Sequence, residues 1–319
     1  MAVYTEVSFE DLEGLLADYD IGAPLSFKGI AEGVENSNFH LQTDRGAFIL
    51  TLYEKRVRAE DLPFFLGLMD HLAARGIACP QPLPSRNGAY SATLNGRPAA
   101  ILTFLNGLSL RRPDAAHCAE AGRTLARLHE AGRGFAIRRP NTLGLAGWRE
   151  LAEATAAEAD SVQDGLGALI AGSLRDLAAG WPVDLPGGVI HADLFPDNVL
   201  FMEGRVSGVI DFYFACNDAF AYDLCVMLNA WCFESDGSYN ITKGKSLIAA
   251  YRGSRDLTAE EIEALPLLMR GVALRFLLTR LYDWLNHAPG ALVRPKDPRE
   301  FSRRLRFNLQ VRHAREYGL

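Results

Sequence analysis

Apolar and polar residues alternate in short runs along the first hundred positions, a pattern typical of β-strands. Residues 25–30, 36–43 and 47–53 have this form, and the Asp-Arg-Gly sequence at 44–46 supplies turn chemistry between the last two. A short acidic helix is expected before them at 8–16. These runs predict an antiparallel meander of three strands.

The spacing becomes helical over residues 59–75, where apolar side chains recur every three or four positions and Gly76 follows as a stop signal. Asn95 and Gly96 then form the strongest short hairpin signal and join a run at 91–94 to one at 97–104. The first part of the chain is therefore predicted to be a five-stranded antiparallel sheet with one covering helix.

Beyond Leu108 the pattern is that of long helices, for example over 113–131 and 257–287. One β-like island at 188–212 interrupts them. A chain of 319 residues is too long for one comfortable core. We therefore expect an α+β protein of two parts, 1–106 and 107–319.

The island carries the candidate chemistry. It reads as a strand at 188–190, a polar loop at 191–198 and a hairpin whose second strand ends in Asp211. This arrangement is expected to hold Asp193, Asn198 and Asp211 at one mouth. Phosphoryl transfer requires a carboxylate that accepts the hydroxyl proton and oxygen ligands that hold Mg²⁺ against nucleotide phosphates.

Asp193 precedes Asn198 by five residues, the separation found in the catalytic loop of protein kinases. The alternative is that both residues only shape a turn and Asp211 only ends a strand. The combined pattern of strand, loop, strand, turn and strand makes this alternative the weaker one.

The stretch HADLFPDNVLF followed by GVIDF resembles the corresponding motif of the aminoglycoside-phosphotransferase-like kinases, a family that includes choline kinases and a bacterial type of homoserine kinase. Further segments resemble the homoserine kinases of this family: EGVENSNFHL, FILTLYEKR, LARLHEAG, IDFYFACNDAFAYDL and ALRFLLTRLYDWLNH. The resemblance extends over essentially the whole chain.

This resemblance implies a two-lobed, protein-kinase-like fold with a nucleotide-binding lobe (1–106) and a mainly helical catalytic and substrate-binding lobe (107–319). It implies that Asp193 is the catalytic base and that Asn198 and Asp211 bind Mg²⁺ at the phosphates of ATP. His191 and Asp223 are expected to support the catalytic loop. Asp223 alternatively serves only as an acid in the first turn of a helix.

The nucleotide contacts are predicted less directly. Backbone and side chains near the first turn would face the phosphate oxygens, and a plain β-turn is the alternative. By fold analogy, the backbone at the end of the last strand would contact adenine. Thr51 stands where protein kinases and most relatives carry a lysine, although the resemblance to homoserine kinases implies Thr here. Either another cation replaces the lysine, or backbone N–H groups and Mg²⁺ suffice. The residues concerned are Gly33, Asn36, Ser37, Asn38, Thr103 and Leu105, with Lys28, Lys55 and Arg56 as substitute cations.

A site for the zwitterion homoserine needs a cation for the carboxylate and an acid for the ammonium group, with Asp193 near the hydroxyl. Arg275 and Asp283 share a helix face, Arg280 lies on another, and Asp218 follows Asp211 closely. These four are the candidate acceptor contacts, and a helix face without a ligand is the alternative. A rival interpretation is an aromatic cage for choline, built from Trp231, Tyr282 and Trp284.

The composition limits the kinds of partner that the protein is expected to bind. A net charge of −6 and a pI near 5.7 disfavour nucleic acid, and no apolar run approaches the ~18 residues of a membrane span. We expect a cytoplasmic enzyme that uses ATP and Mg²⁺ to phosphorylate L-homoserine in threonine biosynthesis. Choline, ethanolamine, an aminoglycoside or hydroxylysine are the alternative acceptors, and a nucleotide-binding pseudokinase is the alternative class. The oligomeric state stays open.

Overall fold

The protein is described by a computed structural model that covers residues 5–30, 36–54, 57–287 and 295–319. The chain divides into two compact units. The first comprises Met1–Asn106 together with Gly208–Tyr213, and the second comprises Gly107–Ser207 and Phe214–Leu319. The first unit is therefore discontinuous in sequence, because a short segment of the predicted β-island belongs to it.

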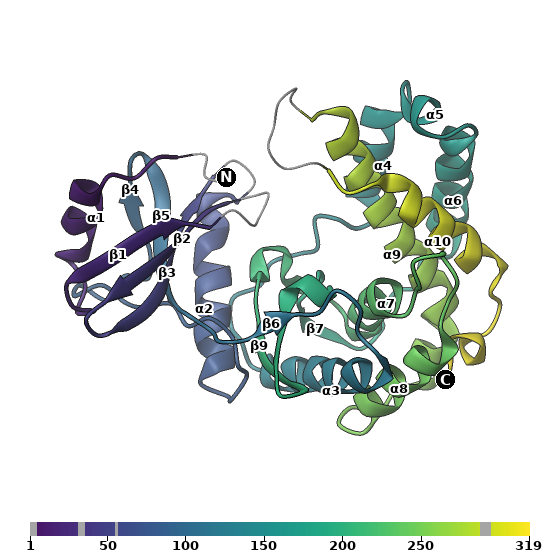
Figure 1. The fold of residues 1–319 in the computed structure, drawn as a ribbon. Coiled ribbons are helices and arrows are strands. Elements are labelled where there is room, and N and C mark those ends of the chain that lie inside the picture. Colours follow the sequence, from purple (N-terminus) through teal and green to yellow (C-terminus); the bar gives the residue numbers. More distant parts are fainter. Residues whose placement is uncertain (1–4, 31–35, 55–56, 288–294) are drawn as a thin grey trace. The chain divides into compact units, whose positions relative to one another are not determined.

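The first unit is an antiparallel sheet with helices packed on it (Figure 1). It has five antiparallel strands, as the alternating pattern predicts, and they lie in the order β1-β2-β3-β5-β4. Its elements are α1 (Phe9–Leu16), β1 (Pro24–Gly29), β2 (Asn36–Thr43), β3 (Gly46–Tyr53), α2 (Leu62–Ala73), β4 (Ala92–Leu94) and β5 (Arg97–Thr103).

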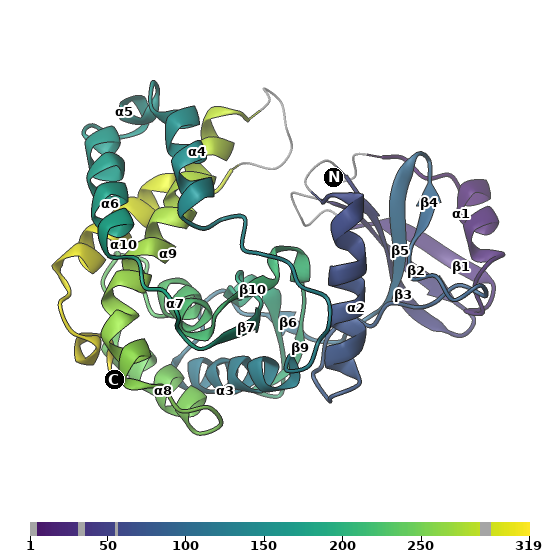
Figure 2. The same ribbon diagram turned by 180° about the vertical axis from the view of Figure 1, so that it is seen from behind.

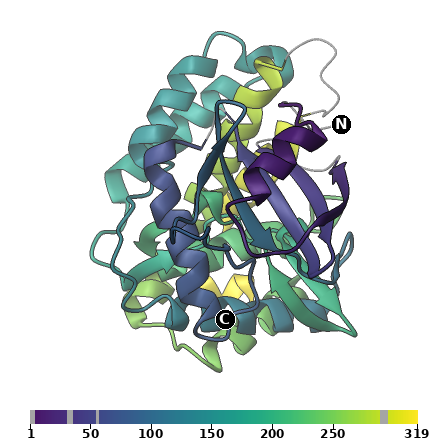
Figure 3. The same ribbon diagram turned by 90° about the vertical axis from the view of Figure 1, so that its left-hand side faces the viewer.

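One face of this sheet forms a core with α1. Figure 3 shows that helix, in purple, lying across the strands. Phe39 and Leu41 of β2 and Leu50 of β3 point to this face and are almost fully buried against Leu12 and its neighbours. Because side chains alternate along a strand, Asn38 and Thr51 lie on the opposite face.

The second unit is mainly helical. Figure 2 shows α3 and α8 side by side beneath the small sheets. Its elements are β6 (Leu108–Ser109), α3 (Ala115–Ala131), α4 (Leu145–Thr155), α5 (Ala159–Val162), α6 (Leu166–Gly180), β7 (Gly187–Ile190), β8 (Val199–Met202), β9 (Arg205–Val209, ending in the first unit), β10 (Cys216–Ala219), α7 (Phe220–Trp231), α8 (Ile241–Arg252), α9 (Ala259–Leu285) and α10 (Pro298–Gln310).

Two of these helices pass through the interior of the unit. Along α7 and α9 buried residues occupy nearly every side, so neither helix has a polar stripe. Thr258 and Glu261 form a capping box at the start of α9, which fixes where the helix begins. No helix in the described part of the chain is both long enough and apolar enough to span a membrane.

The β-island folds as two small sheets. Strands β8 and β9 lie in a sheet with β6, whereas β7 pairs with β10 in a separate two-stranded sheet. The sequence pattern predicts the strands at 188–190, 199–202 and 206–210 but misses β6 and β10, which are only two and four residues long. The polar loop at 191–198 therefore connects two sheets.

Candidate active site

The loop that carries Asp193 is held at its base by a buried carboxylate. Asp223, in the first turn of α7, is fully buried and accepts hydrogen bonds from the backbone N–H groups of His191 (2.8 Å) and Ala192 (2.8 Å). Ala192 adopts a left-handed conformation with φ of 63°, which L-residues other than glycine rarely adopt. Asp223 thus lies beneath the loop and bonds its backbone.

Asn198 links the far end of the loop to Asp193. Its Nδ2 donates to the backbone oxygen of Asp193 (2.8 Å) and to that residue's Oδ2 (3.1 Å). His191 is buried, and its ring nitrogen accepts from the Asp193 N–H (3.3 Å). Asn198 therefore orients the Asp193 carboxylate, and His191 holds the Asp193 backbone. Because Asn198 uses Nδ2 in these contacts, its Oδ1 remains as an oxygen donor for a metal ion.

Two side chains from neighbouring helices hold the carbonyl groups of the loop. Arg275 of α9 donates to the backbone oxygen of Ala192, and the indole N–H of Trp231 donates to that of Leu194 (2.8 Å). Both side chains are only 1% exposed. Arg275 therefore lies beneath the loop, and the indole N–H of Trp231 is engaged by the loop backbone.

A buried chain of polar side chains continues behind Asp223. The Nε2 of His129, on α3, lies 3.1 Å from Asp223 Oδ2, and its Nδ1 lies 2.9 Å from the hydroxyl of Tyr251. Arg255 donates to Tyr251 (3.1 Å) and to Glu261 (2.8 Å). The sequence reasoning missed this chain, although His129 stands within a predicted apolar helix face.

The protonation states of His129 and Asp223 follow from their contacts. Burial lowers the pKa of His129 from its ordinary value of 6.5, against the opposing effect of Asp223. Burial opposes ionisation of Asp223, but the hydrogen bond and charge of His129 still hold its pKa below the ordinary 3.8. A neutral His129 beside an ionised Asp223 must donate from Nε2, so Tyr251 donates to Nδ1.

The first unit contributes a different polar group. Asp211 has φ of 64°. Burial of the nearby Tyr213 raises the pKa of its hydroxyl, and the charge of Asp211 raises it further. The Tyr213 hydroxyl lies 3.1 Å from that of Tyr53. Thr51 donates to Asn38 Oδ1 (2.8 Å) across β2 and β3. A neutral pair thus occupies the position where a lysine was considered.

Other predicted nucleotide contacts are partly engaged within the sheet. Ser37 is fully buried, and its hydroxyl donates to the Glu54 carboxylate (2.7 Å). The backbone N–H of Glu54 donates to Asn36 Oδ1 (3.4 Å). The Thr103 N–H donates to the Gln81 oxygen (2.9 Å), so it is not a free donor for adenine. Leu105 remains a prediction, and Gly33, Lys55 and Arg56 lie outside the described residues.

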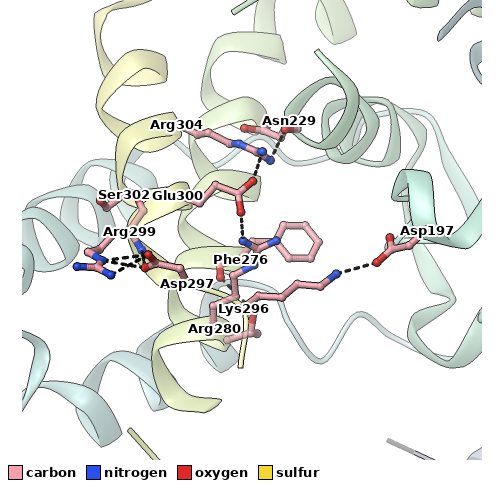
Figure 4. Close-up of polar contacts among 11 residues, drawn as sticks. Asp197, Asn229, Phe276, Arg280, Lys296, Asp297, Arg299, Glu300, Ser302 and Arg304 are labelled. Atoms are coloured by element: carbon pink, nitrogen blue, oxygen red, sulfur yellow. Dashed lines mark hydrogen bonds and ion pairs between the residues drawn. The ribbon is translucent and has the colours of Figure 1, made fainter. Parts of the chain in front are cut away.

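The acceptor candidates do not gather on one helix face. Arg280 forms an ion pair with Glu300 and stacks on the Phe301 ring (4.5 Å), as Figure 4 shows for the ion pair. Asp218 lies in β10 and accepts from Asn141 (2.7 Å). Asp283 is half-buried near the end of α9. Direct contact of these residues with a substrate stays a prediction.

Comparison with known proteins identifies the relatives of this fold. Residues 26–257 match the model of the phosphotransferase enzyme family. A protein of Sinorhizobium fredii named homoserine kinase is 62% identical over 319 residues, which is all of this chain and 98% of the relative.

Solved structures of other kinases share the architecture. A choline kinase from Cryptosporidium parvum has a TM-score of 0.69 at 15% identity, covering 95% of each chain. An amicoumacin kinase in complex with AMP-PNP and Ca²⁺ has a TM-score of 0.68 at 13% identity, covering 98% of this chain and 93% of the other. The predicted α+β, protein-kinase-like fold is confirmed.

Proposed function

Because the chain belongs to the phosphotransferase enzyme family, we propose that it transfers the γ-phosphoryl group of ATP to the side-chain hydroxyl of L-homoserine, forming O-phospho-L-homoserine and ADP in threonine biosynthesis. The observation that carries this proposal is the 62% identity to a homoserine kinase over the whole chain. The choline kinase is 15% identical, so its likeness bears on the fold and not on the acceptor. We propose that the enzyme acts in the cytoplasm, as expected for a biosynthetic kinase that uses ATP.

Asp193 is the group that accepts the proton of the attacking hydroxyl. Its carboxylate is fixed by Asn198 and its backbone by His191, so it needs little reorganisation when the hydroxyl oxygen forms its bond to phosphorus. The bond between the γ-phosphorus and the bridging oxygen breaks, and ADP leaves with the electron pair. Positioning and charge neutralisation supply most of the catalysis in this chemistry.

The donor chemistry of the chain fits a magnesium ion shared with ATP. Asn198 Oδ1 and the Asp211 carboxylate are hard oxygen ligands of the kind Mg²⁺ takes. No group of three or more His, Cys, Asp or Glu side chains among the described residues is arranged to hold a metal alone. Mg²⁺ usually completes its shell with water and substrate phosphates. When bound, it would neutralise phosphate charge.

A panel of acceptors tests the proposal. Purified enzyme with Mg-ATP is given homoserine, choline, ethanolamine, hydroxylysine or kanamycin, and ADP release is followed by a coupled assay. We expect the highest kcat/KM with homoserine. Faster turnover of choline would overturn the acceptor, and ATP binding without ADP release for any acceptor would favour the pseudokinase alternative.

Replacing Asp193 by Asn tests the assigned base. The variant keeps the shape of the side chain but cannot accept the proton, so kcat should fall by about 10²–10⁴-fold while ATP affinity changes little. Asp236→Asn is the matched control, because Asp236 is an exposed turn residue bonded to Ser238. Loss of ATP affinity equal to the loss of kcat would refute the assignment.

A further inference from the structure

A cavity of about 560 Å³ opens in the second unit beside the catalytic loop. Its walls come from residues 111–113, the loop residue Pro196, the end of α7 with the segment after it, α8 and α10. This volume lies within the range of small-molecule sites, roughly 300–1,000 Å³. Among the residues described, none of those assigned above to catalysis, metal binding or the acceptor lines the cavity.

Positive charge dominates the lining. The cationic side chains are Arg111, Arg112, Lys243, Arg303 and Arg304, against three acids. Burial lowers the pKa of Arg304 to about 10, so this side chain stays charged at neutral pH. The whole chain has a net charge of −6, so the charge of the cavity lining has the opposite sign to that of the protein as a whole.

Each acid in the wall already has a cationic partner. Glu234 pairs with Lys243 (2.7 Å), and Asp297 pairs with Arg299 (2.9 Å), which lies outside the lining. Glu300 accepts from both Arg280 and Arg304, as Figure 4 shows. The acids are therefore occupied with other cations and leave part of the positive charge uncompensated.

The uncompensated charge belongs to three arginines. Across residues 5–30, 36–54, 57–287 and 295–319, no hydrogen bond or ion pair engages Arg111, Arg112 or Arg303. Arg304 is held in place by Glu300 and by its bond to the Asn229 oxygen (2.6 Å). The cavity thus joins one fixed guanidinium to three that form no hydrogen bond or ion pair among the described residues, with the charge of Arg303 acting on nearby Asp297.

We infer that this cavity binds a small molecule bearing a phosphate group and acts as an effector site for the catalytic loop. Guanidinium groups match phosphate oxygens in a bidentate, charge-assisted geometry. The route to the loop is short, because Pro196 and Trp231 both line the cavity and Trp231 bonds the Leu194 oxygen. Pro196 and Trp231 thus link the lining of the cavity to the loop that carries Asp193, which does not itself line the cavity.

Calorimetric titration with inorganic phosphate tests the binding. The enzyme is first saturated with Mg-ADP, so that its nucleotide site is filled, and ionic strength is held constant with chloride. Wild type should bind phosphate, and Arg303→Ser should weaken that binding about tenfold. Arg306→Ser is the matched control, since Arg306 is an exposed arginine on the same helix and does not line the cavity.

Three results of the titration would overturn the inference: no phosphate binding by wild type, unchanged binding by Arg303→Ser, or an equal loss in Arg306→Ser. Thermal unfolding checks that the variants fold, and Arg112→Ser replaces Arg303→Ser if the latter does not. A second titration with glycerol 3-phosphate distinguishes an organic phosphate ester from free phosphate as the ligand. If the ligand is an ester, glycerol 3-phosphate should bind more tightly than inorganic phosphate.

Kinetics test the link to the loop. At saturating ATP and homoserine, phosphate should change kcat of the wild type and of Arg306→Ser, and should have at least a tenfold weaker effect on Arg303→Ser. An unchanged kcat would overturn the effector role. Phosphate inhibition that ATP competes away would place the ion at the nucleotide site instead.

Discussion

The catalytic loop of the second unit and the paired strands β2 and β3 of the first unit carry two halves of the proposed chemistry, and they are held in different ways. Charged, fully buried side chains, Asp223 and Arg275, bind the backbone of the loop. In the strands a neutral bond joins Thr51 to Asn38 (2.8 Å).

The difference has a simple physical cause. A loop outside any regular ladder leaves backbone N–H and C=O groups that must find other partners when buried, and here side chains provide them. Strands satisfy their own backbone, so the side chain at Thr51 is not needed for that purpose. A substitution is therefore expected to cost more beneath the loop than on the strands.

Asp223→Asn should have the largest effect. One acceptor oxygen becomes an NH₂ group facing a backbone N–H, which leaves buried donors unpaired at about 1–3 kcal/mol each. Displacement of the loop should lower kcat by about a hundredfold. Chemical denaturation and steady-state kinetics measure both effects. Near-wild-type values for both would show that the loop does not depend on this carboxylate.

Arg275→Met should have the next largest effect. The Ala192 oxygen loses a charge-assisted donor, and we expect a loss of about 1–3 kcal/mol in stability and a roughly tenfold lower kcat. The homoserine KM distinguishes the two roles considered for Arg275. A positioning role leaves KM nearly unchanged, whereas a large rise in KM with unchanged kcat would make Arg275 a substrate contact.

The pH dependence of stability should report on His129. Its folded pKa lies below the ordinary 6.5, so the unfolded state binds more protons as the pH falls below that value. The contribution of neutral His129 to the free energy of unfolding is complete above pH 6.5. It is lost on acidification, by at most about 1.4 kcal/mol per pH unit. Asp223 acts in the same direction only below 3.8.

His129→Gln isolates this contribution. Glutamine can retain a donor and an acceptor but does not titrate, so the fall in unfolding free energy between pH 6.5 and 5 should be shallower than in wild type. Urea denaturation at several pH values measures the slope. Identical slopes would mean that His129 does not titrate on unfolding in this range.

Thr51→Val should have the smallest effect of the four. It removes the hydroxyl that bonds Asn38 and also interacts with Tyr213, at about 1 kcal/mol of stability per hydrogen bond. If Asn38 holds a phosphate, the ATP KM should also rise, by roughly threefold for about 0.6 kcal/mol. Thr43→Val, on the neighbouring strand β2, loses a hydroxyl bond to the Ile21 oxygen and is the control. An equal rise of KM in both variants would exclude Asn38 from the nucleotide site.

Local patterns predicted most of the first unit, because period-two alternation and an Asn-Gly turn directly specify paired strands. They did not predict that β7 pairs with β10, since that pairing joins residues about thirty positions apart. Helix periodicity placed Arg275 and Asp283 on one face but could not indicate which end of the helix is buried. Only tertiary packing puts Arg275 beneath the loop.

The candidate site was predictable where the motif is local and not where its support is distant. The spacing of Asp193 and Asn198 placed both at one loop, and they do share hydrogen bonds. His129 and Tyr251 come from helices 122 residues apart in sequence, so no short motif joins them. A histidine on an otherwise apolar helix face was the one available signal.

The discontinuity of the first unit also constrains how the protein is made. Gly208–Tyr213 belongs to that unit, and Tyr213 packs on Tyr53 and Phe65. During translation, a nascent chain of 106 residues has the sheet but lacks this strip, so the unit cannot close until twice that length has emerged from the ribosome. Its last contacts are of high sequence separation and are expected to form late.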